Sequence, residues 1–271
     1  MNAGLRTAIK SAVPDRAWNL MRDAWYRVAL LRFWKQYMAG LRFDLFVRVY
    51  RTKGLRFMIP RELTSRTHRA RFLHDTHERD ERELVRRHVR ADATVLELGA
   101  CLGVVSCVIN RLLGDPRKQV SVEANPQLIP TLESNRDING CRFGVENCLI
   151  KQTSDGSFYV NDCFVMGSAD DRRGEKIRVP IDTVEALERK HALSFDTLFM
   201  DIQGGEHEFF CENAGLLARC KTVIYEGHPH IIGRAKCDEC REMLTAAGLT
   251  LVERLGLVEA WAKAPHAAGG N

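Results

Sequence analysis

The chain has 271 residues, of which 45% are hydrophobic and 28% are charged, with nine cysteines and a formal net charge of +5. This length and composition fit one large globular domain with an added segment and exclude a disordered chain. An odd number of cysteines without a framework spacing argues against a small secreted fold held by disulfides.

The charge is distributed unevenly along the chain. Residues 1–90 carry 21 Lys and Arg against 9 Asp and Glu, whereas residues 91–271 carry 19 against 26. No cleavable signal peptide is expected, because a polar stretch that contains a tryptophan follows Arg6 and Lys10. The longest apolar run near the N-terminus, residues 28–31, is too short to span a bilayer. We therefore predict a cytoplasmic protein whose two halves have different surroundings. No nucleic-acid module accompanies the basic half, so we expect no nucleic-acid partner.

Residues 14–38 are predicted to form a helix that begins at a proline suited to a first turn. Apolar residues recur within it at helical spacing, at Trp18, Met21, Trp25 and Val28. Basic residues flank them, at Arg16, Arg22, Arg27, Arg32 and Lys35. A basic helix that carries tryptophans could lie on the anionic inner surface of a membrane. Alternatively, it packs on the main domain with its arginines in solvent.

Two short strands, residues 41–50 and 55–59, are predicted next, with Lys53 and Gly54 as the turn between them. A charged helix over residues 76–89 then leads into the first core strand. We divide the chain into a basic extension (residues 1–75), a main domain (76–264) and a frayed tail (265–271).

From residue 94 onward, strand and helix patterns alternate, which predicts an α/β, Rossmann-like, mostly parallel sheet with helices on both faces. The predicted strands cover residues 94–98, 119–122, 145–150, 195–200 and 221–225. Helices are predicted over residues 104–113, from 124, and over 182–190 and 234–247. An inserted β pair, residues 156–160 and 176–179, flanks a polar loop at 167–174. Residues 249–254 and 257–262 form a predicted antiparallel hairpin at the C-terminal end.

The first strand ends in a glycine turn that indicates the class of ligand. Gly99, Ala100, Cys101 and Gly103 follow Glu97 in a G-x-x-x-G spacing, unlike the G-x-G-x-x-G of dinucleotide sites. A carboxylate at residue 97 would repel a pyrophosphate but suits a cationic ligand such as S-adenosylmethionine. We expect the methionyl ammonium near Glu97 and the ribose on Glu123, which ends the second strand. The alternative is a generic turn with two acids that face solvent.

Three further side chains are expected at the carboxyl ends of strands, where open α/β sheets bind ligands. Asp201 follows the fourth strand, and Glu226 and His228 follow the fifth. Methyl transfer to an alcohol requires removal of the hydroxyl proton, for which His228 is our first candidate. Asp201 would orient the acceptor or the cofactor, and a divalent metal held by Asp201 and Glu226 is a variant of this scheme. The alternative is that these side chains cap helices or form hydrogen bonds within loops.

Four other polar or sulfur-bearing residues receive a structural interpretation. We expect Glu206 and His207 to act as a cap or a loop hydrogen-bonding group. Cys237 and Cys240 lack a second pair of metal ligands, so ordinary reduced cysteines are expected there. Glu78, on the lead-in helix, could face the glycine turn or lie in solvent.

Over residues 55–262 the chain resembles the FkbM-type S-adenosylmethionine-dependent methyltransferases. The stretches that carry the resemblance are VLELGACLG at 95–103, VEANP at 122–126, ENC at 146–148, IDTV at 181–184 and MDIQGGE at 200–206. The resemblance implies that Glu123 binds the ribose, that Asn147 lies near the adenine and that Asp201 lies beside the transferred methyl group. We also expect cofactor contacts from Gly99, Ala100, Cys101, Gly103, Ala124 and Asn125, which follow the first two strands. Gln203 departs from the family pattern, which has an acid there.

Members of this family typically O-methylate hydroxyl groups of sugars, glycolipids and natural products, so the resemblance implies a small-molecule or glycan acceptor. Two alternatives stay open: an N-methyltransferase that acts on a protein or a small amine, and a catalytically silent nucleotide-binding module. The Gln203 departure favours the silent module. The glycine spacing and the terminal hairpin disfavour a dinucleotide oxidoreductase.

Overall fold

The computed structural model describes residues 15–152, 156–160 and 175–264. The chain divides into two compact units. The smaller unit comprises residues 1–47 and 66–74, and the larger unit comprises residues 48–65 and 75–271. The predicted polar loop at 167–174 and the predicted tail at 265–271 lie outside the described residues.

The smaller unit is built from two helices, α2 (Asp15–Phe46) and α3 (Arg66–Leu73). Asp44 on α2 forms ion pairs with Arg66 and Arg69 on α3, and the rings of Phe43 and Phe72 lie 6.0 Å apart. Gly40 permits close approach, since a Cβ there would lie 1.9 Å from the carbonyl oxygen of Arg66. Contact with α3 therefore stabilises the last turns of α2.

The predicted strand over residues 41–50 is wrong for most of its length, because α2 continues to Phe46. Only β1 (Tyr50–Thr52) is extended, and it forms a hairpin with β2 (Leu55–Phe57). Lys53 and Gly54 make the predicted turn, both with positive φ. The sequence pattern did not reveal α3.

Two asparagines of α6 (Ile129–Ile138) and its C-terminal cap anchor this hairpin. Asn135 accepts from the Met58 N–H at 2.7 Å and donates to the Met58 carbonyl at 3.1 Å. Asn139 bonds the backbone of Arg56 in the same way, at 2.9 and 2.6 Å. The side-chain amides thus replace the peptide groups of a neighbouring strand.

The larger unit is organised around a seven-stranded sheet with the order β12-β13-β11-β10-β3-β4-β5. Its strands are β3 (Val95–Leu98), β4 (Gln119–Val122), β5 (Gly144–Glu146), β10 (Thr197–Met200), β11 (Thr222–Glu226), β12 (Thr250–Leu255) and β13 (Val258–Ala262). The first five are mutually parallel, and β13 runs antiparallel to both β11 and β12. This confirms the predicted Rossmann-like fold with its C-terminal antiparallel hairpin.

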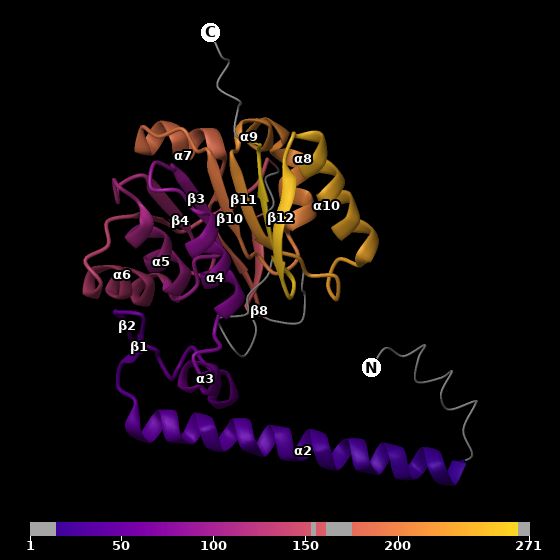
Figure 1. Ribbon diagram of the computed structural model, residues 1–271. Helices are drawn as coiled ribbons and strands as arrows, with labels where there is room; N and C mark the ends of the chain where they lie inside the picture. The colour runs from indigo at the N-terminus through magenta and orange to yellow at the C-terminus, as the bar shows by residue number, and fades with distance from the viewer. Residues whose placement is uncertain (1–14, 153–155, 161–174, 265–271) are drawn as a thin grey trace. The chain divides into compact units, whose positions relative to one another are not determined.

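Helices cover both faces of this sheet. On one side lie α4 (Arg79–His88), α5 (Val104–Leu112) and α6, and on the other lie α8 (Glu206–Glu212) and α10 (Arg234–Ala246) (Figure 1). The main core also includes side chains of α7 (Val184–His191) and α9 (Ala214–Arg219). Because side chains alternate along a strand, Leu96 and Leu98 enter this core, whereas Glu97 faces the opposite side.

The third predicted strand is divided in the structure. β5 pairs with β4 in the main sheet, whereas β6 (Leu149–Ile150) leaves it and pairs in parallel with β9 (Ile181–Asp182). The predicted inserted pair is confirmed as β7 (Ser157–Val160) and β8 (Glu175–Arg178), which are antiparallel. Among the described helices, none combines the length and the apolar character that crossing a membrane requires.

Candidate active site

The glycine turn after β3 and the segment after β10 touch through their backbones. Gly99 has a φ of 85°, and a Cβ on it would lie 1.8 Å from the carbonyl oxygen of Asp201. The Asp201 N–H in turn donates to the carbonyl of Leu98 at 3.0 Å. The structure therefore brings the predicted cofactor turn and the predicted catalytic aspartate side by side.

The remainder of the turn leads directly into α5. The Gly103 N–H donates to the Ala100 carbonyl at 2.8 Å, and Gly103 adopts a left-handed conformation with a φ of 80°. A Cβ at this position would meet Leu132 at 2.7 Å. Cys101, also at positive φ, is half-buried. The two glycines thus permit the tight, left-handed course of the turn and its close packing.

Glu123 connects the turn to the second strand. Its two carboxylate oxygens accept hydrogen bonds from the backbone N–H groups of Cys101, at 2.7 Å, and Asn125, at 2.8 Å. Burial raises the pKa of Glu123, and these backbone donors oppose that shift. Each oxygen retains a lone pair, so the carboxylate can still accept from the hydroxyls of a ribose.

Asn147 lies beside Glu123 but is engaged by the backbone. Its side-chain amide donates to the carbonyls of Glu123 at 2.8 Å and Ala124 at 3.1 Å. This places Asn147 next to the residues predicted to bind the cofactor, and its adenine contact stays a prediction.

The structure differs from the expectation for Glu97, whose side chain is fully buried rather than open to the turn. One carboxylate oxygen accepts from Ser121 and, at 3.1 Å, from Gln119, both on β4. Residues 97 and 121 are register partners in parallel strands, so their side chains emerge on the same face, under α5. Burial raises the pKa of Glu97 to about 7. The predicted ammonium contact is therefore not available to this carboxylate as it stands.

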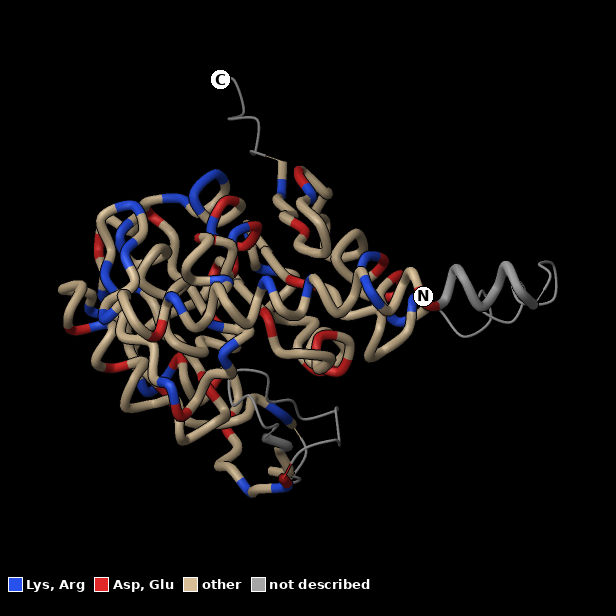
Figure 2. Tube along the Cα trace, turned by 90° about the horizontal axis from the view of Figure 1, so that it is seen from below, with Lys and Arg blue, Asp and Glu red and all other residues tan. Residues whose placement is uncertain are grey.

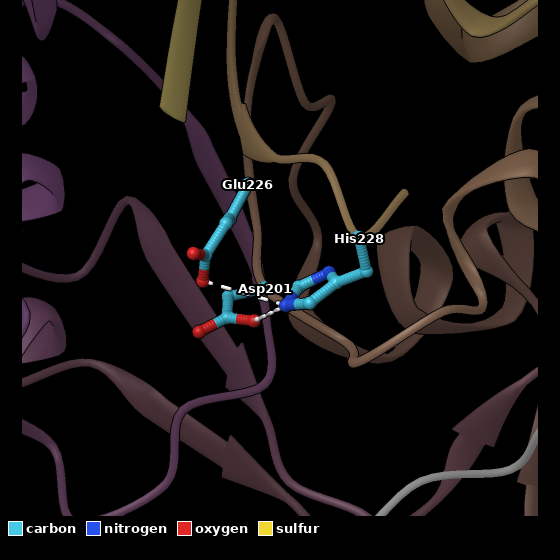
Figure 3. Close-up of side chains that lie close together, drawn as sticks. All are labelled: Asp201, Glu226 and His228. Atoms are coloured by element: carbon cyan, nitrogen blue, oxygen red, sulfur yellow. Dashed lines mark ion pairs between the residues drawn. The ribbon is translucent and has the colours of Figure 1, made fainter. Parts of the chain in front are cut away.

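Asp201, Glu226 and His228 converge where β10 and β11 end. His228 Nε2 lies 3.5 Å from Asp201 Oδ1 and 3.5 Å from Glu226 Oε2, so both carboxylates face one ring nitrogen (Figure 3). The parallel pairing of β10 with β11 brings these strand ends together. All three predicted catalytic side chains thus belong to one group.

A fourth member of this group, Glu206, was expected to be only a cap or a loop hydrogen-bonding residue. It begins α8, where its Oε1 accepts from the Gly204 N–H at 3.0 Å. The same oxygen lies 2.8 Å from His228 Nδ1, and the side chain is fully buried. We call Asp201, Glu206, Glu226 and His228 the His228 cluster. Glu206 does belong to the family motif at 200–206, but the sequence does not distinguish a helix-capping acid from an acid that is buried against a histidine.

His228 is the basic side chain of the His228 cluster, and three acids surround it. Burial by itself lowers the pKa of His228, but the carboxylates of Glu206 and Glu226 outweigh burial and raise it to about 10. The ring therefore carries its proton near neutral pH, in contrast to the free general base expected from the sequence. Burial and the charge of Glu226 raise the pKa of Asp201 well above its usual range.

Gln203 occupies the position where the family pattern has an acid. Its amide nitrogen donates to Asp201 Oδ1 at 2.9 Å. A carboxylate there would repel Asp201, so the amide relieves one unfavourable contact in a region already rich in acids.

Two acids from the segment before the first core strand face the same region. Glu78 directly precedes α4, without a capping hydrogen bond from its side chain, and its charge acts on both Glu123 and Asp201. Glu81, which the sequence analysis did not single out, is buried on α4; burial and then Glu78 raise its pKa to about 7. The functional end of the sheet is therefore strongly acidic.

The Cys237 and Cys240 thiols are buried on α10, and burial raises the pKa of both. Within the described residues, the metal-compatible group comprises Asp201, Glu226 and His228 and includes neither cysteine. His207 lies outside the His228 cluster, with its Nε2 2.6 Å from Glu239.

Solved structures with similar folds include methyltransferases. One is a protein of the NADB-Rossmann superfamily from Streptococcus agalactiae, with 13% identity, 67% of each chain covered and a TM-score of 0.43. The precorrin-6y C5,15-methyltransferase from Geobacter metallireducens shares 14% identity over 76% of this chain and 94% of its own, with a TM-score of 0.42. An O-methyltransferase from Bacillus cereus, solved in complex with SAH, shares 15% identity over 68% and 80%, with a TM-score of 0.40.

All three TM-scores are low, so the family assignment rests on the sequence. No match was found among curated proteins. The methyltransferase FkbM domain matches residues 97–250, which is more than half of the chain and includes both the glycine turn and the His228 cluster. The chain belongs to the FkbM methyltransferase family and is an S-adenosylmethionine-dependent methyltransferase.

Proposed function

We propose that this enzyme transfers the methyl group of S-adenosylmethionine to a hydroxyl group of a sugar, glycan or glycolipid. The observation that carries the hydroxyl acceptor is the His228 cluster, whose proton-binding groups lie directly beside the glycine turn. An alcohol must lose its proton as the methyl group arrives, whereas a neutral amine can attack first and lose its proton later. The family resemblance is the reason to propose that this hydroxyl group belongs to a sugar.

The residues of the turn fit S-adenosylmethionine as the cofactor. Gly99 and Gly103 let the turn pack closely against Asp201 and Leu132, where a Cβ would clash, and this packing fixes the backbone that a ligand would contact. Glu123 is held by two N–H groups and aimed at the same turn. Its carboxylate would accept from the ribose hydroxyls, and Ala124, Asn125 and Asn147 would lie around the adenosine.

The acceptor would bind on the side of Asp201 and Glu226, in line with the sulfur–methyl bond. The role of these side chains is to hold the hydroxyl and to take up its proton, while His228 keeps the two carboxylates in place. Methyl transfer needs little covalent participation by the protein, so alignment accounts for much of the rate.

Cofactor binding is tested by calorimetric titration of S-adenosylmethionine into the wild type and Glu123→Ala. We expect binding by the wild type and at least tenfold weaker binding by Glu123→Ala, since the ribose acceptor and the tie between turn and strand are both lost. Glu123→Gln, which retains one acceptor oxygen, should fall between them. Equal affinity of all three proteins would contradict the assigned ribose role.

The acceptor class is tested by transfer of a labelled methyl group to panels of sugars, glycolipids and amines. We expect transfer to hydroxyl acceptors, and Glu226→Gln should lower kcat by about 10² or more while S-adenosylmethionine still binds. Transfer to amines alone, unaffected by Glu226→Gln, would support the N-methyltransferase alternative. Cofactor binding without transfer to any acceptor, in the presence or absence of added divalent cations, would support the silent module.

We also propose that α2 holds the enzyme at an anionic membrane surface, where a lipid-linked acceptor would be found. Side chains of α2 that are about half exposed or more include Trp25, Tyr26, Leu30, Leu31, Phe33 and Trp34. Arg27, Arg32 and Lys35 are interspersed with them, and Lys and Arg along the helix can be followed in Figure 2. Aromatic rings that enter a headgroup layer and cations that meet anionic lipids are the chemistry of interfacial helices.

A further inference from the structure

The side chains of Asp201, Glu226 and His228 form a set of converging donor atoms. One ligand-type atom from each lies within 4.8 Å of the others. The two carboxylates approach His228 Nε2 from different strands, one from the end of β10 and one from the end of β11 (Figure 3). Two oxygens and one imidazole nitrogen on one side of a small space are a typical metal-binding set.

The acids of this site have little positive charge to balance them. Among the described residues, Asp201, Glu206 and Glu226 form ion pairs with His228 and with no other basic side chain. Three acidic side chains thus share one histidine, and a multivalent cation would balance this excess of acids.

Glu206 supplies a carboxylate beside the ring nitrogen of His228 that faces away from the proposed ligand atoms. Its carboxylate lies 2.8 Å from His228 Nδ1, which fixes the ring and directs Nε2 toward Asp201 and Glu226. The side chain is fully buried, and its Oε2 has no hydrogen-bond partner among the described residues. A carboxylate behind the distal nitrogen of a ligating histidine sets its tautomer and orientation. The structure thus contains both the donor set and its support.

We propose that Asp201, Glu226 and His228 Nε2 bind a divalent cation, which takes the place of the proton on Nε2, with Glu206 as the positioning residue behind the imidazole. The mixed oxygen and nitrogen donors suit Mn²⁺ or Fe²⁺ better than Mg²⁺ or Ca²⁺, which prefer oxygen alone. The inference rests on the proposed hydroxyl acceptor, because a bound divalent cation makes a hydroxyl more acidic and orients it. It deepens that function by assigning the site where the acceptor oxygen is held.

The test uses Mn²⁺ as the probe and full-length protein freed of metal by a chelator. Calorimetry and the electron paramagnetic resonance spectrum of Mn²⁺ should show one bound ion per chain. Glu226→Gln should lower the affinity at least tenfold, and Glu206→Gln by about 10- to 100-fold through loss of ring orientation. His207→Ala is the control, since it removes a histidine that is also paired with an acid but lies outside the cluster, and it should bind Mn²⁺ as the wild type does.

Absence of Mn²⁺ binding by the wild type would overturn the proposal, as would unchanged binding by Glu226→Gln. Equal losses in His207→Ala and Glu226→Gln would also overturn it, because they would show unspecific binding to surface acids. S-adenosylmethionine binding, measured in the same preparations, separates this result from the fate of the proposed function. Retained cofactor binding and methyl transfer in the presence of a chelator would leave the methyltransferase intact and remove the metal.

Discussion

The carboxyl edge of the central sheet and helix α2 differ in which side chains they bury and which they expose. At the edge of the sheet, charged groups such as Glu206 and His228 are buried and held by named partners. On α2, large apolar groups such as Trp25 and Leu31 are exposed, at 47% and 62%. Buried charged groups that are held in place are typical of a site for a small polar ligand. An exposed apolar surface is typical of contact with a protein or a membrane. The two regions should therefore respond differently to substitution.

The largest effect is expected from Gly99→Ala, which would break the contact between the two loops at the carboxyl edge. The new Cβ would lie 1.8 Å from the Asp201 carbonyl, on a backbone with a φ of 85°. We expect loss of cofactor binding and destabilisation by roughly 3 kcal/mol, since both loops must move. Titration with S-adenosylmethionine and chemical denaturation measure the two effects.

Gly215→Ala is the matched control for that substitution. A Cβ on Gly215, in α9, would meet nothing within 4 Å. Alanine favours a helix over glycine, so this variant should bind the cofactor normally and be unchanged or slightly more stable. If Gly99→Ala behaved like Gly215→Ala, the edge would be far less tightly packed than the structure indicates.

A smaller effect is expected from Glu97→Gln, which tests how much buried charge costs beneath the glycine turn. The pKa of Glu97 rises from its ordinary value of 4.5 to about 7 in the folded protein, so folding favours the protonated acid. Stability is therefore lost as the pH rises from about 4.5 to about 7, by on the order of 3 kcal/mol. Glu97→Gln should remove that loss and be the more stable protein at pH 8.

Denaturant unfolding of both proteins at pH 5 and pH 8 gives the comparison. Glu185→Gln, at an exposed position of α7, is the control and removes an acid without touching the buried group. An equal difference between wild type and Glu97→Gln at the two pH values would show that this carboxyl group does not titrate in that window.

The smallest effect on stability is expected on α2. Trp25→Ser and Trp34→Ser remove rings that are about half exposed, so the unfolding free energy should change little. Binding to anionic vesicles should nevertheless weaken about tenfold for each substitution, because ring burial in the headgroup layer is lost. Vesicle sedimentation at several lipid concentrations measures this.

Leu251→Ser serves as the reference for the α2 variants. Leu251, on β12, is as exposed as Trp25, at 47%, but lies in the larger unit. It should leave vesicle binding unchanged, and neutral vesicles should bind all of these proteins weakly. Unchanged binding of both tryptophan variants to anionic vesicles would contradict the proposed membrane contact of α2.

The sequence was sufficient for the elements whose pattern is local. The alternation of apolar strands with amphipathic helices and the terminal hairpin predicted the main sheet correctly, because each strand is apolar and bounded by turn residues. It failed for residues 41–46, where contact with α3 keeps an ambiguous apolar segment helical. Pairing of β6 with β9 was also missed, since register between distant segments leaves no local pattern.

The candidate site shows the same division. Strand-end residues such as Asp201 and His228 could be placed together because parallel strands end at one edge. Glu206 was expected to be only a cap or a loop group, and Glu81 was not singled out, because only the packing of α8 and α4 shows that these acids are buried. Glu97 was assigned to the turn because its spacing fits, although the alternation of the strand turns it toward Gln119 and Ser121.

The division of the chain has a practical consequence for work with this enzyme. The polypeptide passes between the two units at residues 47–48, 65–66 and 74–75. The smaller unit is therefore formed by two separate segments of the chain, and a single truncation cannot remove it whole. Truncation of α2 would strip α3 of the helix against which it packs and leave Arg66 and Arg69 beside a shortened stub. Point substitutions on the exposed surface of α2 are therefore a safer test of the proposed membrane contact than truncation, because they leave α3 in place.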